Sequence, residues 1–197
     1  MEEVYMTFPQ SLCFDHTTQF QQLVYTLLKL FKRLRMLPSI PGEDIPLLSG
    51  LALYHDIGKT ALPDTVVYKA GKLTETEFDL MKEHTTLGAK MVAVLPELQG
   101  EKEQQYAREI CLYHHERWDG GGYPYGLRGR NIPGYVQVIS LADVYDALLA
   151  SRSYRKAYSH EEAVKLILDR DCGAFSPGIL RVFRRYIGEV CEQIYPN

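Results

Sequence analysis

Residues 47–64 of the chain, LLSGLALYHDIGKTALPD, place a histidine and an aspartate at the end of a dense apolar run. Such a run predicts a buried helix, which Pro63 would end because proline cannot continue a helix. His55 and Asp56 would then be polar side chains in or beside a core, and buried polar groups are nearly always bonded to a partner.

Three further polar positions lie in apolar helical segments, at His84, His114–His115 and Asp143, and the steps from His55 onward are 29, 30 and 29 residues. A helix of about fifteen residues and its return cover such a step, since each residue rises about 1.5 Å. These positions can therefore return to one level of a helical bundle, where inward-pointing side chains build metal sites. Imidazole suits iron, zinc and manganese, and a carboxylate adds a hard ligand.

Each position taken singly also has a simpler explanation. A lone buried histidine is more often a hydrogen-bonded core residue than a ligand, Asp143 could pair with a base, and His114–His115 could end a helix at the surface. The combination favours a metal site, because five of the six histidines occur where a cluster would use them: His16, His55, His84, His114 and His115. His160 follows a helix cap, and we expect it to be solvated.

Helical periodicity dominates the remainder, and strand signals are weak, so the sequence predicts an all-α fold. Apolar residues recur at helical spacing from Phe20 to Leu37, and Thr74 with Glu77 forms a capping box for a helix that continues through His84 towards Leu95. Further helices are expected over 101–115 and 136–151, after Ser159, and after Ser176 as N-cap. Residues 119–134, DGGGYPYGLRGRNIPG, contain six glycines and predict a long functional loop.

Composition limits the classes of function. The net charge of -3, with acids and bases mixed, argues against binding to a nucleic-acid polymer, which is usually held by a large basic surface. We expect no membrane partner, because no apolar stretch of about eighteen residues occurs and the acidic N-terminus does not resemble a signal peptide. The four cysteines are scattered, which favours reduced thiols and a cytoplasmic location.

Five segments together resemble the HD-GYP family in order and spacing: YHDIGKTALPD, GKLTETEFDLMKEHTTLGAKM, HHERWDGGGYPYGLRGRNIP, LADVYDALLASRSYRKAYS and GAFSPGIL. The match runs from about Leu51 to Phe183. The resemblance implies an HD-superfamily helical bundle with a glycine-rich GYP loop, in a single domain over 1–197. Within it, 1–46 would be an N-terminal helix and linker of weaker match, 47–185 the core, and 186–197 the end of the last helix.

The same resemblance implies a phosphodiesterase that converts cyclic di-GMP, or a related cyclic dinucleotide, to linear pGpG and onward to GMP. The alternative is a degenerate domain that binds a cyclic dinucleotide or a partner protein without turnover. The expected cofactor is a pair of divalent metal ions, iron or manganese foremost, with zinc, nickel, cobalt or magnesium as other choices. A protein partner or a homodimer is compatible with the sequence.

Residue roles follow from the motif positions. The resemblance implies that Asp56 bridges the ions and that Lys59 acts at the reacting phosphate; Tyr123 would contact the nucleotide, and Arg152 and Arg155 would bind phosphate or guanine. The implied metal ligands are His16, His55, Asp56, His84, His114, His115 and Asp143. Members of the family with three metals carry a glutamate one turn before the first histidine. This chain has Leu12 there, so two ions are expected.

Overall fold

The segment 136–151, which is apolar almost all round, forms the central helix of the protein, α7 (Gly134–Leu149). The computed structural model describes residues 14–151 and 156–195, with the side chains of 14–17 left aside. In those ranges the regular structure is helical and contains no strand, which confirms the all-α prediction; one isolated bridge joins Asp119 to Arg128. None of the described helices is long and apolar enough to cross a membrane.

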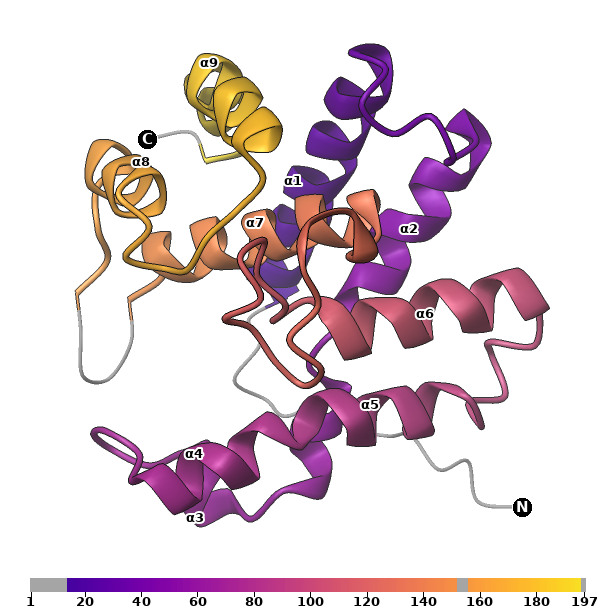
Figure 1. Cartoon of the computed structure of the whole chain (residues 1–197), viewed down its shortest axis with the longest axis vertical. Coiled ribbons are helices and arrows are strands. Elements are labelled where there is room, and N and C mark those ends of the chain that lie inside the picture. The colour runs from indigo at the N-terminus through magenta and orange to yellow at the C-terminus, as the bar shows by residue number, and fades with distance from the viewer. Residues whose placement is uncertain (1–13, 152–155, 196–197) are drawn as a thin grey trace.

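The other helices surround α7 (Figure 1). Helix α1 packs against α2, α7 and α9, while α5 packs against α6 on the opposite side of the molecule. The bounds are α1 (Phe14–Arg33), α2 (Ile45–Leu51), α3 (Asp64–Val67), α4 (Glu75–Lys82), α5 (His84–Val92), α6 (Glu101–Tyr113), α8 (His160–Leu168) and α9 (Pro177–Ile194). Short 3-10 segments are η1 (Gly42–Asp44), η2 (Ala52–Tyr54), η3 (Ile57–Ala61) and η4 (Gly129–Asn131).

The core forms where the apolar faces of these helices meet. Val24, Leu27 and Phe31 of α1 are fully buried, as are Ile139 and Tyr145 of α7. Burial of one such side chain contributes about 1.5–3 kcal/mol, so this contact fixes α1 across α7. The capping boxes predicted at Thr74 and Ser159 are both present.

Two predicted helices are divided in the structure. The apolar run after Leu47 ends as an α-helix at Leu51 and continues as 3-10 turns, so His55 and Asp56 lie at a turn. The helix expected from Thr74 to Leu95 breaks at Glu83 into α4 and α5. At the break, the His84 ring bonds the carbonyl oxygen of Met81 at 2.6 Å and the Thr85 hydroxyl donates to that of Lys82 at 2.9 Å. Side chains thus compete for backbone carbonyls at this point.

Of two predictions about single residues, one was confirmed and one was wrong. Ser176 occupies the N-cap position of α9 and Pro177 its first turn, as predicted, although the Ser176 side chain makes no cap hydrogen bond. His160 is half-buried rather than solvated, and its Nδ1 lies 2.6 Å from the hydroxyl oxygen of Tyr145. This contact arises because α8 packs against α7, which local sequence does not report.

Gly58 allows η3 to lie directly against α5. A Cβ atom added at Gly58 would lie 2.0 Å from the carbonyl oxygen of His84 and 2.5 Å from the backbone nitrogen of Gly88. Both obstacles are backbone atoms, so a flexible side chain cannot relieve the clash. The approach places Asp56 beside His84, and it requires glycine at position 58.

We predict that Gly58→Ala lowers the free energy of unfolding by about 3 kcal/mol, because any larger residue forces η3 away from α5. Urea denaturation followed by circular dichroism measures the change. Gly42→Ala is the matched control, since a Cβ there meets nothing within 4 Å, and it should stay within about 0.5 kcal/mol of wild type. Equal losses in the two variants would contradict the close-approach explanation.

Candidate metal centre

Four side chains from three parts of the fold converge on one point. Asp56 lies in the turn between η2 and η3, His84 begins α5, and His114 and His115 follow the last turn of α6. One ligand atom from each of the four lies within 4.8 Å of the others. The positions predicted from steps of about thirty residues therefore do return to one level, and the arrangement is compatible with a divalent metal ion.

Backbone carbonyl groups fix the orientation of three imidazole rings. Nδ1 of His55 lies 2.8 Å from the oxygen of Ala52, Nδ1 of His84 lies 2.6 Å from that of Met81, and Nδ1 of His114 lies 3.0 Å from that of Ile110. A carbonyl oxygen only accepts, so each Nδ1 carries the proton, and in a neutral ring Nε2 then presents a lone pair. Histidines that ligate metals in proteins are held in this way by the second ring nitrogen.

The Nε2 atoms of His84 and His114 face each other, an arrangement that a bound cation would stabilise. Nε2 of His84 lies 3.2 Å from Nε2 of His114, so two neutral rings would present one acceptor to another. Oδ1 of Asp56 lies 3.3 Å from His84 Nε2 and 3.7 Å from His114 Nε2. This oxygen is buried and accepts no hydrogen bond. A buried acceptor without a donor costs about 1–3 kcal/mol, and a bound metal ion would offset that cost. The residues therefore fit a metal.

The second oxygen of Asp56 faces a different group of side chains. Oδ2 lies 3.4 Å from Nε2 of His55 and accepts a hydrogen bond from the ammonium group of Lys59. Nε2 of His55 in turn lies 3.5 Å from Oδ1 of Asp143. Asp56 thus stands between two clusters, with one oxygen towards His84 and His114 and the other towards His55.

The surroundings set the charge states of these groups. Burial lowers the pKa of His84 to about 4 and holds that of His115 far below its ordinary value, so both rings are neutral at pH 7. Burial also lowers the pKa of His55, but the Asp56 and Asp143 carboxylates raise it by more, to well above its ordinary value. The pKa of Asp56 lies well below its usual range, because Lys59 and His55 outweigh the effect of burial.

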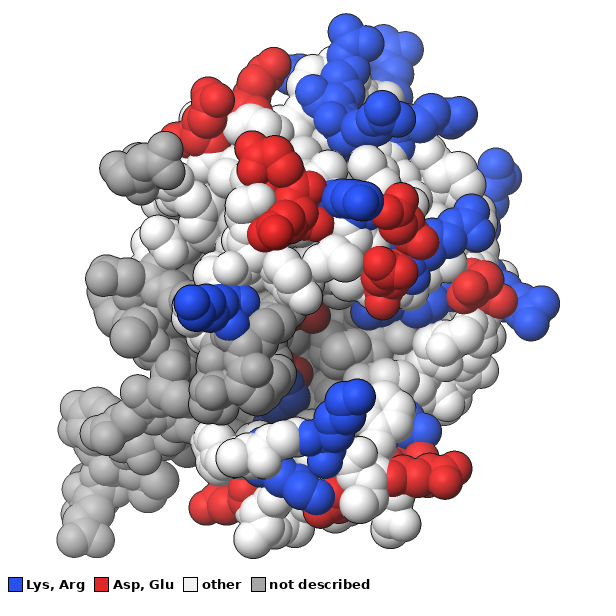
Figure 2. Space-filling view, turned by 90° about the vertical axis from the view of Figure 1, so that its left-hand side faces the viewer, with Lys and Arg blue, Asp and Glu red and all other residues white. Residues whose placement is uncertain are grey.

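The GYP loop places an aromatic ring beside the cluster. The ring of Tyr123 stacks on His115, with centroids 4.6 Å apart and planes at 26°, and Phe78 of α4 meets Tyr123 edge-on at 6.1 Å. Burial raises the pKa of the Tyr123 hydroxyl, which stays protonated. Figure 2 shows a hollow between the α8–α9 part and the α3–α4 part, with acidic and basic atoms deep inside it.

Glu116 holds this loop, and Arg117 joins the end of α6 to α7. Glu116 is 3% exposed, and its carboxylate accepts hydrogen bonds from the backbone N–H groups of Tyr125 at 2.8 Å and Leu127 at 2.9 Å. Arg117 donates to the carbonyl oxygen of His114 at 3.0 Å and to Ser140 Oγ at 2.9 Å. The sequence alone assigned these two residues no role. Only their position directly after His114–His115 indicated that they lie near the site.

Three predicted site residues cannot be placed. His16 belongs to α1, but its side chain lies outside the described residues, and Arg152 and Arg155 lie outside them altogether. The described structure brings together the other predicted ligands, together with Lys59 and Tyr123.

A protein-family model described as "HD domain" matches residues 12–172, which is most of the chain. The chain belongs to the HD domain family. Its HD-GYP motifs agree with this membership, and its relatives include proteins named as cyclic dinucleotide phosphodiesterases. One, a cyclic di-GMP phosphodiesterase of Vibrio cholerae, is 44% identical over 140 residues, which cover 71% of this chain and 28% of that protein.

Two further relatives are also named as cyclic dinucleotide phosphodiesterases. A cyclic di-GMP phosphodiesterase of Thermotoga maritima is 38% identical over 70% of this chain and 36% of its own length. A 3'3'-cGAMP-specific phosphodiesterase of Vibrio cholerae is 31% identical over 80% of this chain and 30% of its own length. The chain thus spans about a third of the length of these curated relatives. A solved cyclic GMP-AMP phosphodiesterase structure from Vibrio cholerae shares the fold, with a TM-score of 0.62 at 17% identity, over 92% of this chain and 46% of that one.

We predict that Glu116→Gln lowers the free energy of unfolding by about 2 kcal/mol, because one carboxylate oxygen becomes an amide donor facing a backbone N–H. Hydrogen exchange of the Tyr125 and Leu127 amides should become faster, while the far-ultraviolet circular dichroism stays unchanged. Asp119→Asn is the control: Asp119 is exposed, and its Oδ1, which accepts from Gly121 N–H, has an equivalent in asparagine. Unchanged exchange at both amides in Glu116→Gln would show that Glu116 does not hold the loop.

Proposed function

We propose that this chain is a metal-dependent phosphodiesterase that hydrolyses cyclic di-GMP, or a related cyclic dinucleotide, to linear pGpG and then to GMP. The reaction adds one water molecule across one P–O bond, which opens the ring and leaves a terminal phosphate. Relatives named for cyclic di-GMP and for 3'3'-cGAMP both support a cyclic dinucleotide. We place cyclic di-GMP first, because the relatives named for it are more similar to this chain, at 44% and 38% identity, than the one named for 3'3'-cGAMP, at 31%.

The observation that carries the proposal is the position of the Asp56 carboxylate. Its two oxygens face two separate sets of imidazole nitrogens, at 3.3 Å to His84 and 3.4 Å to His55. We infer a dinuclear centre, with Asp56 shared, with His84, His114 and His115 on one side and with His55 and Asp143 on the other. His16 is proposed as an additional ligand on the His55 side.

A pair of divalent ions, when bound, would activate a water molecule at neutral pH and act as Lewis acids on the diester. Mixed imidazole and carboxylate ligands suit iron or manganese, and the same ligands accept zinc, nickel, cobalt or, less well, magnesium. Two ions rather than three follow from Leu12 at the position where three-metal members have glutamate.

The chain's own residues would bind and polarise the substrate. The Lys59 side chain is 35% exposed beside Asp56, so its ammonium group is accessible to a phosphate oxygen. A cation at that oxygen acts chiefly in the transition state, where negative charge increases. Tyr123 offers a ring face and a protonated hydroxyl to the nucleotide, and Arg152 and Arg155 are proposed to bind phosphate or guanine.

The competing proposal is a domain that binds a cyclic dinucleotide or a partner protein without turnover. The described residues favour catalysis, because His55, Asp56, Lys59, His84 and Asp143 are all present. His55, Lys59 and His84 contact Asp56 directly. A pure binding site would not need a carboxylate shared between His84 and His114 on one side and His55 on the other.

Incubating the manganese-loaded protein with cyclic di-GMP should yield pGpG, as identified by liquid chromatography and mass spectrometry. We predict that Lys59→Met lowers kcat by about 100-fold or more, with metal content unchanged, because the lost charge acts in the transition state. Lys72→Met, which removes an exposed lysine, is the control and should retain full activity. Tight binding of cyclic di-GMP without any product would favour the binding-only alternative.

Metal content tests the shared carboxylate directly. We predict that Asp56→Asn loses most of its bound metal, because an amide cannot supply two anionic oxygens, while its helical circular dichroism stays native. Inductively coupled plasma mass spectrometry gives the metal-to-protein ratio. Asp64→Asn, an exposed aspartate on α3, should keep the wild-type ratio. A wild-type ratio in Asp56→Asn would exclude Asp56 as a ligand.

A further inference from the structure

A second groove, of about 690 Å³, lies at the base of the GYP loop. Its walls come from the segment after α1, from the loop at Trp118 and Arg130, from Gln137 of α7, and from the start of α9. It shares no lining residue with the metal cluster. No lining residue is acidic, and two are arginines, so the local charge favours an anion.

Gln137 lines this groove, and its side-chain oxygen is buried and accepts no hydrogen bond. Gln137 is 8% exposed, and its Nε2 donates to the carbonyl oxygens of Ile132 at 3.0 Å and Gly129 at 3.4 Å. Rotating the amide would set its oxygen against those carbonyls, so the orientation is fixed. Oε1 then accepts no hydrogen bond. Among the described side chains, only this atom and Oδ1 of Asp56 are buried polar atoms without a partner. Such an oxygen favours a ligand that offers an N–H or O–H group.

The start of α9 supplies anion-binding groups to the same groove. The helix has 18 residues, and the Ser176 side chain does not cap it. Its first-turn N–H groups, including those of Gly178 and Ile179 in the groove wall, have no acceptor within the helix. Free N–H groups and the helix dipole together bind phosphate groups well.

Three side chains complete the site. Arg35 is exposed at the end of α1 in the left-handed conformation, with φ 57°, and Arg130 is exposed in η4. Trp118 is partly buried and also lines the groove. Arginines bind phosphate with paired hydrogen bonds, and an indole ring offers a face on which a planar base can stack.

We propose that this groove binds a nucleoside monophosphate, with its phosphate between Arg35, Arg130 and the start of α9, and its base against Trp118. A base N–H group would donate to Oε1 of Gln137 once a small shift of that side chain opens the buried oxygen to the groove. Guanine has suitable donors at N1 and N2, so GMP is the probe. The site is distinct from the proposed catalytic centre and does not depend on its activity.

Trp118 is the single tryptophan of the chain and lines the groove, so a change in tryptophan fluorescence measures ligand binding there. The metal-free full chain, held in chelator, is titrated with GMP, guanosine and inorganic phosphate. We expect saturable quenching by GMP, with phosphate and guanosine at least about tenfold weaker, because each offers only part of the contacts. Isothermal titration calorimetry with GMP should give the same dissociation constant.

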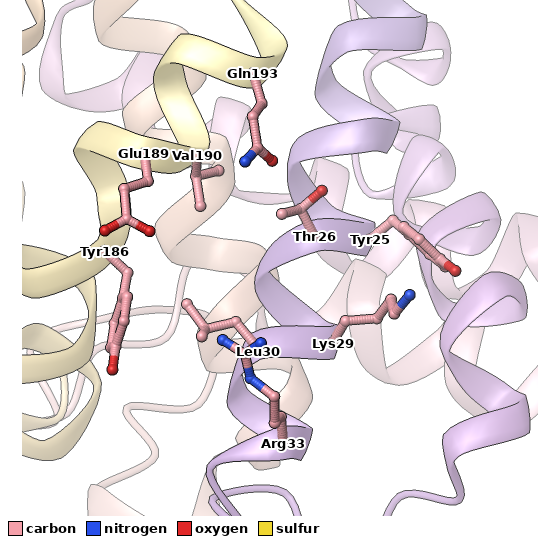
Figure 3. A pocket seen from close by; sticks show the side chains of 9 residues that line it. All are labelled: Tyr25, Thr26, Lys29, Leu30, Arg33, Tyr186, Glu189, Val190 and Gln193. Carbon is pink, nitrogen blue, oxygen red and sulfur yellow. The ribbon is translucent and has the colours of Figure 1, made fainter.

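Arg35→Asn and Arg130→Gln should each weaken GMP binding about tenfold or more, since each removes a charged phosphate contact. Both residues are exposed, and asparagine tolerates the left-handed conformation at 35, so the fold is preserved. Arg33→Gln is the matched control: Arg33 lies in the same helix end but lines a different groove, between α1 and α9 (Figure 3). It should bind GMP as wild type does.

Three results would overturn the proposal: no quenching at millimolar GMP, equal binding of phosphate and GMP, or full GMP affinity in both arginine variants. If Tyr123→Ala instead abolished the signal, GMP would be binding at the catalytic hollow. None of these results bears on hydrolysis of cyclic di-GMP, so the two proposals fail independently.

Discussion

Buried acceptors that point at one another are unfavourable unless a cation lies among them, and this constraint governs the centre of the molecule. The Nε2 atoms of His84 and His114 are 3.2 Å apart, and Oδ1 of Asp56 faces both. Backbone carbonyls hold the protons of both rings on Nδ1, so neither ring can turn a donor towards the other. The protein keeps three lone-pair donors at one point, which is the physical requirement for a metal site.

Irregular backbone makes that convergence possible. Asp56 lies in a turn between two 3-10 segments, and His84 follows a break in a helix, so neither ligand stands on the long regular helices that the sequence predicted. Gly58 brings the turn into contact with α5, Glu116 attaches the GYP loop next to His114, and Arg117 donates to the carbonyl oxygen of His114. The regular helices, above all α7 and α1, form the packed core. The candidate metal ligands lie at helix ends and breaks.

Much of this was predictable from the sequence, for identifiable reasons. Steps of about thirty residues between His55, His84, His114 and Asp143 fit helix-and-return geometry, and capping boxes at Thr74 and Ser159 depend only on local sequence. Other features depend on contacts across the fold. The break at Glu83 arises from side chains that compete for carbonyls, and Glu116 acts on amides nine and eleven residues away. The side-chain oxygen of Gln137 lacks a partner because its amide nitrogen bonds carbonyl oxygens of the GYP loop, a contact that forms only in the folded protein.

The central claim is that Asp56 is shared between two metal ions. Anomalous diffraction from crystals of the metal-loaded protein, collected on both sides of the metal absorption edge, tests it most directly. The account predicts two peaks, one beside each oxygen of Asp56, the first with His84, His114 and His115 and the second with His55 and Asp143. A single fully occupied peak, or two peaks that Asp56 does not contact, would contradict it.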